Sequence, residues 1–220
     1  MGLHMNLFDL DREIRDCRRC ELILSNWPDD PPSSHAPVRP RPILSRPGLT
    51  RILLIGQAPG LTEYRGGLPF SGGAGRGIRD LLAKCGLQSS EFDKYVYQTS
   101  IMKCFPGRRL NKTRYEDRIP CASMTANCIG FLGQQIELIS PRLIITLGGF
   151  AVTQLDRLRK IKRRNLSEVV GRSDQWNEAR IVYLPHTSGS SRFLNDPANL
   201  QSFLAAQNLL SKELIIACKP

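Results

Sequence analysis

Four cysteines have a spacing that is typical of metal ligands. Cys17 and Cys20 form a Cys-x-x-Cys pair, and Cys104 and Cys121 form a second pair with 16 residues between them. Four thiolates can hold either a tetrahedral zinc ion or a [4Fe–4S] cluster. A zinc ribbon usually contains two Cys-x-x-Cys pairs, so the long second spacing favours an iron–sulfur cluster without excluding zinc.

Three further cysteines complete the set of seven. We expect Cys85, Cys128 and Cys218 to be buried, unreactive thiols. Cys128 follows Cys121 by seven residues, so it could share a helix face with that residue and compete with it as the fourth ligand. The sequence opens with no signal-peptide pattern, so we expect reduced thiols rather than disulfides.

A glycine-rich loop follows an apolar segment at residues 54–77. It contains eight glycines in the 22 residues from Gly56 onward, a density that lets the backbone approach a ligand closely. The dinucleotide-binding fingerprint would follow the strand directly. Here the nearest match, residues 73–77, lies about 17 residues beyond the strand and has the wrong spacing, and no Gly-Lys-Ser/Thr follows. The loop instead holds Glu63 and Phe70, which suggests that it lines a pocket, although Phe70 could also be a core aromatic.

The elements that position these residues alternate between strands and helices. Short segments that are apolar along most of their length predict strands that are buried on both faces, at 51–56, 95–99, 142–148 and 180–185. Helical patterns lie at 75–87, within 114–139, at 149–164 and at 197–214. This alternation predicts an α/β fold in which a four-stranded parallel sheet is covered on both faces.

Unusual residues follow each predicted strand. Ligands of open parallel sheets bind beyond the carboxyl ends of the strands. Gln57, Thr99-Ser100, Gly148-Gly149 and His186 lie at these ends, so we expect them to meet at one edge of the sheet and form a single site. The alternative for His186 is a purely structural role.

Length and charge set further bounds. The 220 residues suit a single domain, which we assign to residues 1–220. Within 1–27 we expect a helix over 6–24 that carries the first cysteine pair. Residues 28–48 hold 7 of the 15 prolines and predict an irregular, exposed connection.

The net charge of +11 favours an anionic partner. No apolar run reaches the length of a membrane span, and we expect a cytoplasmic, nucleoid-associated monomer of prokaryotic type.

Together these motifs resemble the uracil-DNA glycosylase superfamily in its iron–sulfur branch, often called family 4. That branch has Gly-Glu-Ala-Pro-Gly, an acidic residue, Gly-x-Pro-Phe-x-Gly-x-Ala-Gly, Thr-Asn-x-x-Lys-Cys and a closing His-Pro. The corresponding residues here are 56–60, Glu63, 67–75, 99–104 and 186–187. The four spaced cysteines match the pattern of the branch, and the resemblance covers roughly residues 15–205.

The resemblance implies a fold and an activity. The fold is a three-layer α/β/α sandwich around a four-stranded parallel sheet. The activity is hydrolysis of the N-glycosidic bond of uracil in DNA, which leaves an abasic site. The spaced cysteines would hold a [4Fe–4S] cluster with a structural or DNA-positioning role.

The resemblance also implies roles for site residues. Uracil would stack on Phe70, and the backbone of the loop at Ala58 and Gly60 would approach the everted base. His186 would donate a hydrogen bond to uracil O2. Glu63 is the first candidate to orient the attacking water and Gln57 the second. The alternative for Glu63 is a loop carboxylate that pairs with Arg65.

Three residues depart from the family motifs. Gln57 replaces a glutamate, Ser100 replaces the asparagine that would pair with the uracil edge, and Thr187 replaces proline. A hydroxyl cannot reach both O4 and N3–H as an amide can. The departure at Ser100 therefore leaves open the preference for uracil over other deaminated bases.

Two segments could contact DNA. Arg192 or Phe193, in the loop 188–194, could fill the gap left by an everted base; the alternative is a capping turn with Phe193 packed inward. Residues 157–164 carry six basic side chains, and Lys160 and Arg163 could bind phosphates there. The alternative for this run is a solvated helix end.

Two other functions remain open at this stage. A non-catalytic iron–sulfur protein that binds abasic or damaged DNA is compatible with the departures at Gln57 and Ser100. An iron–sulfur electron carrier fits the cysteines but not the loops.

Overall fold

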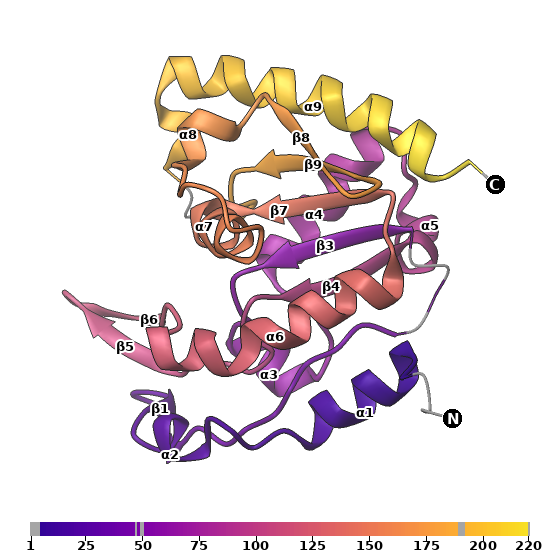
Figure 1. Ribbon diagram of the computed structural model, residues 1–220. Coiled ribbons are helices and arrows are strands. Elements are labelled where there is room, and N and C mark those ends of the chain that lie inside the picture. The colour runs from indigo at the N-terminus through magenta and orange to yellow at the C-terminus, as the bar shows by residue number, and fades with distance from the viewer. Residues whose placement is uncertain (1–4, 47, 49–50, 189–191, 220) are drawn as a thin grey trace.

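The computed structural model describes residues 5–46, 48, 51–188 and 192–219 (Figure 1). The helices are α1 (Leu7–Asp16), α2 (Glu21–Leu24), α3 (Leu61–Gly66), α4 (Gly73–Lys84), α5 (Ser89–Tyr95), α6 (Ala122–Ile139), α7 (Gly148–Leu158), α8 (Leu166–Val169) and α9 (Pro197–Ala217). The strands are β1 (Pro28–Asp30), β2 (Ser34–Pro37), β3 (Ile52–Gly56), β4 (Val96–Ser100), β5 (Arg108–Asn111), β6 (Arg114–Asp117), β7 (Leu143–Leu147), β8 (Ser173–Trp176) and β9 (Ala179–Leu184). A 3₁₀ turn spans Phe193–Asn195.

The predicted parallel sheet is confirmed. Its strands lie in the order β4-β3-β7-β9, and each neighbouring pair is parallel. Every residue of β3, β4 and β7 is buried, as are all residues of β9 except Arg180. Strands that are covered on both faces are mostly apolar in sequence, which is why their segments could be recognised.

The sheet has five strands rather than the predicted four. β8 pairs with β9 in antiparallel register, with Ser173 opposite Val182. Its sequence, Ser-Asp-Gln-Trp, is mostly polar because an edge strand is only partly covered. It turns into β9 at Asn177, whose φ of +52° lies in the left-handed region that asparagine tolerates.

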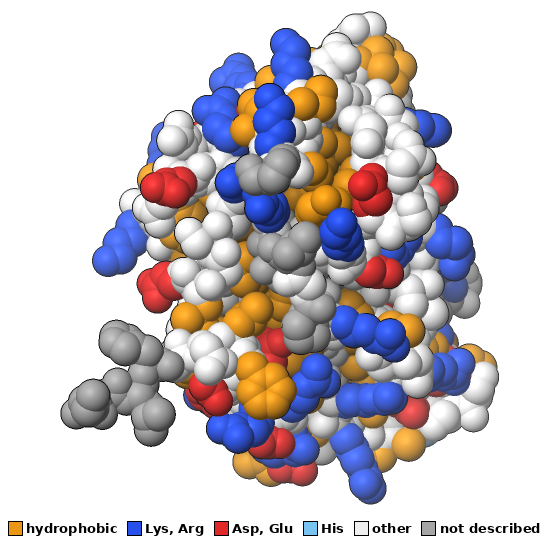
Figure 2. Space-filling model, turned by 90° about the vertical axis from the view of Figure 1, so that its right-hand side faces the viewer, with side chains coloured by type: hydrophobic (Ala, Val, Ile, Leu, Met, Phe, Trp, Pro, Cys, Tyr) orange, Lys and Arg blue, Asp and Glu red, His pale blue; other side chains and the backbone are white. Residues whose placement is uncertain are grey.

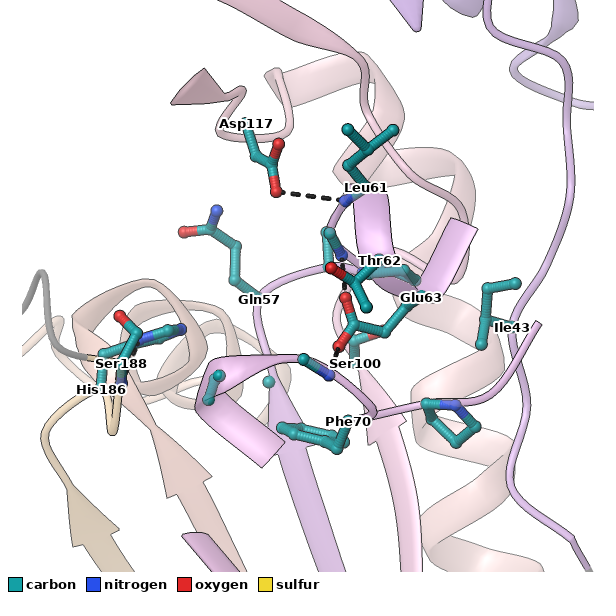
Figure 3. A pocket seen from close by; sticks show the side chains of 18 of the residues that line it. Ile43, Gln57, Leu61, Thr62, Glu63, Phe70, Ser100, Asp117, His186 and Ser188 are labelled. Carbon is teal, nitrogen blue, oxygen red and sulfur yellow. Dashed lines mark hydrogen bonds between the residues drawn. The ribbon is translucent and has the colours of Figure 1, made fainter. Parts of the chain in front are cut away.

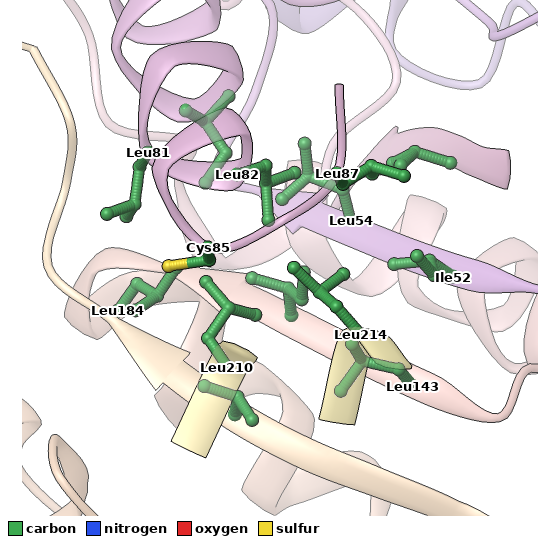
Figure 4. Close-up of a cluster of buried hydrophobic side chains, with 14 of the residues drawn as sticks. Ile52, Leu54, Leu81, Leu82, Cys85, Leu87, Leu143, Leu184, Leu210 and Leu214 are labelled. Carbon is green, nitrogen blue, oxygen red and sulfur yellow. The ribbon is translucent and has the colours of Figure 1, made fainter. Parts of the chain in front are cut away.

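Helices cover both faces of the sheet and form the outer two layers. Ile52, Leu54 and Leu143 point to one face, where they pack with side chains of α4 and α9 (Figure 4). The alternating residues Leu53 and Ile144 point to the other face, where they pack with α6 and α7. Period-2 alternation of the strands therefore gives each apolar layer its own set of side chains.

The N-terminal segment differs from the prediction. The expected helix 6–24 is interrupted between α1 and α2, at residues 17–20, which contain the first cysteine pair. The expected exposed connection over 28–48 contains the antiparallel pair β1–β2 and then packs against the body. Val38 and Leu44 are buried in a third apolar cluster with Leu10 and Phe131, so burial of its apolar residues fixes this proline-rich stretch.

The helical pattern within 114–139 is also only partly correct. α6 begins at Ala122, and the preceding residues form the hairpin β5–β6. This hairpin extends from the body on the side to which the parallel strands point (Figure 1). Among the described residues, no helix combines the length and the apolar character that crossing a bilayer requires.

Candidate active site

A cavity of about 750 Å³ lies at the carboxyl ends of the parallel strands. Its lining includes Gln57 after β3, Ser100 at the end of β4, Leu147 at the end of β7 and His186 after β9. Figure 3 shows side chains from these separate elements around one hollow. The strand ends meet at a single cavity, as predicted, but the residue that lines it at the end of β7 is Leu147 rather than the expected Gly148-Gly149.

Phe70 covers the end of β3 inside this cavity. Its backbone φ is +48°, and its ring lies so close to Gly56 that a Cβ there would be 2.9 Å from the ring. The backbone of Phe70 also contacts α4, because a Cβ on Gly75 would be 1.6 Å from the Phe70 carbonyl oxygen. Phe70 packs partly against the core and partly lines the cavity, so both expectations for it hold. Glycine is needed at 56 and 75 because a Cβ there would overlap the ring or the carbonyl group of Phe70.

Glu63 links two segments of the glycine-rich loop. One carboxylate oxygen accepts the N–H of Gly60 at 3.0 Å, and the other accepts the N–H of Gly72 at 2.8 Å. The alternative pairing with Arg65 is not observed, because Arg65 binds Asp30. Glu63 lines the cavity, and its two hydrogen bonds hold the backbone at Gly60 and Gly72 in place.

Ser100 lies in the buried floor of the cavity. Its hydroxyl donates to the carbonyl oxygen of Met102 at 2.7 Å, so the hydroxyl proton is already used. Towards the cavity, the Ser100 oxygen can therefore only accept a hydrogen bond.

Lys103 supports this floor from beneath. Its buried ammonium donates to the Ser100 carbonyl at 2.6 Å and to the Thr99 hydroxyl at 2.9 Å. Burial lowers the pKa of Lys103 to about 8, and the nearby Cys128, Asp11 and Cys104 partly offset that effect. The buried polar groups beneath the floor are thus satisfied by each other, as burial requires.

The support continues through the core to the N-terminal helix. Thr99 donates to the Gln135 side chain at 2.9 Å, and Gln135 donates to the Tyr97 hydroxyl at 3.1 Å. Tyr97 donates in turn to Asp11 of α1 at 2.7 Å. Burial raises the pKa of Asp11. This hydrogen-bonded chain connects the cavity floor to α1.

His186 faces the cavity from the end of β9. Its Nδ1 accepts the N–H of Ser188 at 3.2 Å and lies 2.7 Å from the Ser188 hydroxyl. Because Nδ1 accepts a backbone N–H, the neutral ring carries its proton on Nε2. The His186 side chain is accessible to solvent, and partial desolvation by the protein atoms around it lowers its pKa from the ordinary 6.5, which the charge of Glu63 partly offsets.

The residue after His186 anchors its loop to α4. Thr187, which stands where the family motif has proline, donates its hydroxyl to the Ala74 carbonyl at 2.7 Å. Its own carbonyl oxygen lies so close to Gly77 that a Cβ there would be 2.5 Å away. The departure from proline therefore adds a hydrogen bond that holds His186 beside the glycine-rich loop.

The hairpin β5–β6 contributes cavity residues that the sequence reasoning missed. Arg108, Arg109, Glu116 and Asp117 all line the cavity. Asp117 accepts the N–H of Leu61 at 3.3 Å, and burial raises its pKa. The Asn-Lys-Thr-Arg turn could have indicated a hairpin, but its two short strands show no apolar alternation and the helical pattern that follows concealed it.

The two segments predicted to bind DNA each contain exposed side chains and side chains that are packed or paired within the protein. Arg192 is exposed, whereas Phe193 packs against the core in its 3₁₀ turn, as the capping-turn alternative expected. Residues 189–191 of this loop lie outside the described part of the chain. In the basic run, Arg159 and Arg164 each pair with Asp174 at 2.8 Å, while Lys160 and Arg163 are exposed.

Basic side chains are not confined to the surroundings of the cavity. Figure 2 shows the face that lies at the right of Figure 1, where Lys and Arg are mixed with Asp, Glu and apolar side chains. The net charge of +11 therefore does not by itself locate a binding surface.

The cysteines of the predicted ligand set gather in the third apolar cluster. Cys20 and Cys104 are buried there, and Cys17 and Cys121 pack against it. Burial raises the pKa of both Cys20 and Cys104, and neighbouring thiolates, including that of Cys17, raise it further. Across the described ranges, no three His, Cys, Asp or Glu side chains form a group that could hold a single metal ion.

Cys128 is the fifth thiol of this region. It is buried in the same cluster, and its sulfur accepts the backbone N–H of Lys103 at 3.3 Å. Cys85 lies elsewhere, between α4 and α9, and Cys218 is at the end of α9.

Comparison with known proteins agrees with this geometry. Residues 44–210 match the family model described as the uracil DNA glycosylase superfamily. The chain is 29% identical over 185 residues to a type-4 uracil-DNA glycosylase of Archaeoglobus fulgidus, covering 82% of this chain and 81% of that protein. It is 28% identical over 195 residues to a type-4 uracil-DNA glycosylase of Saccharolobus solfataricus, covering 87% and 79%. It is 30% identical over 148 residues to a type-4 uracil-DNA glycosylase of Pyrobaculum aerophilum, covering 67% and 69%.

The family match includes the whole parallel sheet and each strand end that lines the cavity. This chain therefore belongs to the uracil-DNA glycosylase superfamily.

Proposed function

We propose that this protein is a monofunctional uracil-DNA glycosylase, which hydrolyses the N-glycosidic bond of uracil in DNA and leaves an abasic site. The observation that carries the proposal is the placement of Phe70 and His186 in one cavity at the strand ends. Family membership and the printed names of the relatives support the same activity. A base within a duplex is out of reach, so the target nucleotide must rotate out of the stack to enter this cavity.

The everted uracil would lie between the Phe70 ring and the backbone at Ala58 and Gly60. Stacking on an aromatic side chain contributes about 1–3 kcal/mol per base. Ser100 can accept the N3–H of uracil, because its own proton is donated to Met102. Cytosine carries an unprotonated N3 and would place one acceptor against another, so the site should reject it.

His186 stabilises the departing base. Cleavage moves the electron pair of the glycosidic bond onto uracil, and charge accumulates at its O2. Because Nδ1 accepts the Ser188 N–H, the neutral imidazole keeps its proton on Nε2 and would donate it to this oxygen in a hydrogen bond. A donor of this kind typically contributes about 2.7–4 kcal/mol to the transition state.

Water then adds at C1′, and its surplus proton leaves to solvent or to the uracil anion. We assign the orientation of this water to Gln57 ahead of Glu63, which reverses their order in the sequence interpretation. Both oxygens of Glu63 already accept backbone N–H groups, whereas Gln57 lines the same cavity. Glu63 would then act by holding the loop.

Incubation with a single-stranded oligonucleotide containing one uracil, followed by hot alkali, tests the proposal. We expect strand cleavage at the uracil position, and none in the same oligonucleotide with thymine there. Absence of alkali-dependent cleavage, combined with tight binding to abasic DNA, would instead support the non-catalytic alternative.

We also propose that Cys17, Cys20, Cys104 and Cys121 hold a [4Fe–4S] cluster. Each iron of such a cluster binds one thiolate, so the thiols need not surround one point as they must around a single ion. The gathered thiols suit this arrangement. When bound, the cluster would supply a structural link, because Cys104 directly follows the Lys103 that supports the cavity floor.

Exchange of single cysteines tests the ligand set. We expect Cys104→Ser to lose most of its iron and inorganic sulfide, because it removes a ligand. Cys128→Ser is the matched control in the same cluster and should retain both. Iron and sulfide per chain, together with the brown colour of fresh protein, provide the measurement. Full retention in Cys104→Ser, or loss in Cys128→Ser, would contradict the proposed set.

The pH dependence follows from His186. Partial desolvation lowers its pKa below 6.5, so the neutral form with Nε2–H is present at and above that pH. Protonation of Nδ1 would break its bond with the Ser188 N–H. We therefore expect kcat/KM for uracil-containing DNA, which reports the groups of the free protein, to be flat near neutrality and to fall only below pH 6.5. An acid limb centred above pH 6.5 would show that this assignment is wrong.

We further propose that the protein acts as a monomer on nucleoid DNA in the cytoplasm, and its net charge of +11 suits an anionic partner. Lys160 and Arg163 are exposed and remain candidates for phosphate contacts.

A further inference from the structure

A second depression lies beside the active-site cavity. It has a volume of about 510 Å³ and is lined by Asn111, Lys112, Thr113 and Arg114 on one side and by Arg192 on the other. We call these five residues the hairpin groove. All five are exposed.

The groove and the cavity share one hairpin. The residues of β5–β6 nearest the body, Arg108 and Asp117, line the cavity. Its turn, which pairs Asn111 with Arg114, lines the groove. Arg192 comes from the loop that begins at His186, so both sides of the groove continue into elements of the active site.

The two ends of the hairpin differ in whether their basic side chains form ion pairs. At the cavity end, Arg108 pairs with Asp30 at 3.1 Å and Arg109 pairs with Glu116 at 3.0 Å. At the groove, no acidic residue is part of the lining. Lys112, Arg114 and Arg192 form no ion pair with any residue that the structure describes.

We propose that the hairpin groove binds the phosphodiester backbone of the DNA strand that carries the everted nucleotide. Arg114 is near enough to Glu116 to help lower the pKa of that carboxyl, but it forms no ion pair with it. Three cations that form no ion pair with the described residues, placed around a depression that no acidic residue lines, are electrostatically suited to an anionic chain. The groove adjoins the cavity, so a strand bound in it is positioned to deliver its neighbouring nucleotide to Phe70 and His186. This inference rests on the proposed glycosylase function, and it assigns Arg192 to phosphate rather than to the gap in the stack.

Salt-dependent binding tests the groove. We compare wild type with the double variant Arg114→Gln/Arg192→Gln, using a labelled single-stranded oligonucleotide without uracil and fluorescence anisotropy. Each lost phosphate contact on single-stranded DNA lowers the slope of log K against log salt by about 0.7. We therefore expect the magnitude of the slope to fall by about 1–1.5 and KM for uracil-containing DNA to rise at fixed salt. The variant Arg114→Lys/Arg192→Lys keeps both charges and should restore the slope.

A matched control removes the same charge elsewhere. Lys84→Gln/Lys212→Gln changes two exposed lysines, one at the end of α4 remote from the cavity and one in the C-terminal half of α9. We expect this control to keep the wild-type slope. An unchanged slope in Arg114→Gln/Arg192→Gln, or an equal decrease in the control, would overturn the inference.

Failure of the groove and failure of the proposed function give different results. If wild type excises uracil but the groove variant binds with the wild-type slope, only the groove assignment is wrong. If wild type shows no excision, the glycosylase proposal is wrong, while the slopes still report whether the groove binds a DNA strand.

Discussion

Replacing His186 with glutamine is expected to lower the rate of uracil excision about 100- to 1,000-fold at saturating DNA, which is the usual effect of removing one pre-positioned donor to a developing oxyanion. The Nδ1 of His186 accepts the Ser188 N–H, which leaves Nε2–H for the uracil oxygen. Glutamine cannot place a donor at the same position with the same support. The measurement is single-turnover excision, quantified by alkaline cleavage.

The matched control for this variant is His35→Gln. His35 is exposed in β2 and is not part of the cavity. It should excise uracil at the wild-type rate. If His186→Gln retained more than about a tenth of the wild-type rate, the donor role of His186 would be refuted, since the remaining effect would be below about 1.4 kcal/mol.

Replacing Gly75 with alanine is expected to disrupt the Phe70 loop. The added Cβ would lie 1.6 Å from the Phe70 carbonyl oxygen and 2.3 Å from its carbonyl carbon, so backbone must move. Overpacking of this kind typically destabilises a protein by about 1–3 kcal/mol. Because the moving segment carries the stacking ring, the excision rate should fall at least 10-fold even at temperatures where the variant remains folded.

Gly130→Ala is the control for the effect of replacing a helical glycine that has no close neighbour. Gly130 lies within α6, and a Cβ there would meet nothing within 4 Å. Alanine has the higher helix propensity, so this variant should be up to about 1 kcal/mol more stable and fully active. Urea unfolding and excision rates measure both variants. Wild-type stability together with a wild-type rate in Gly75→Ala would contradict the close approach of α4 to Phe70.

Three features were harder to predict from the sequence than the buried sheet: the edge strand β8, the hairpin β5–β6 and the packing of the proline-rich connection. β8 is polar and short because it lies at an edge, and its pairing depends on β9 rather than on its own pattern. The hairpin β5–β6 is largely exposed, so no apolar period marks it. The proline-rich connection is held by Val38 and Leu44, which contact residues distant in sequence.

In the site, too, the sequence predicted some features and not others. Gln57, Ser100 and His186 were expected together because parallel strands bring their carboxyl ends to one edge. The partners of these residues were not predictable. Ser100 donates to Met102, Glu63 bridges Gly60 and Gly72, and Thr187 binds the backbone of α4.

The sequence by itself determined the parallel α/β sheet, the residues at its carboxyl edge and the grouping of the cysteines, because mostly apolar strands and motif spacing are local patterns. Only the tertiary structure decided that both oxygens of Glu63 and the hydroxyl proton of Ser100 already have partners, which ring nitrogen of His186 carries the proton and which cations form no ion pair. These properties depend on contacts between segments far apart in the chain, and no local pattern encodes them.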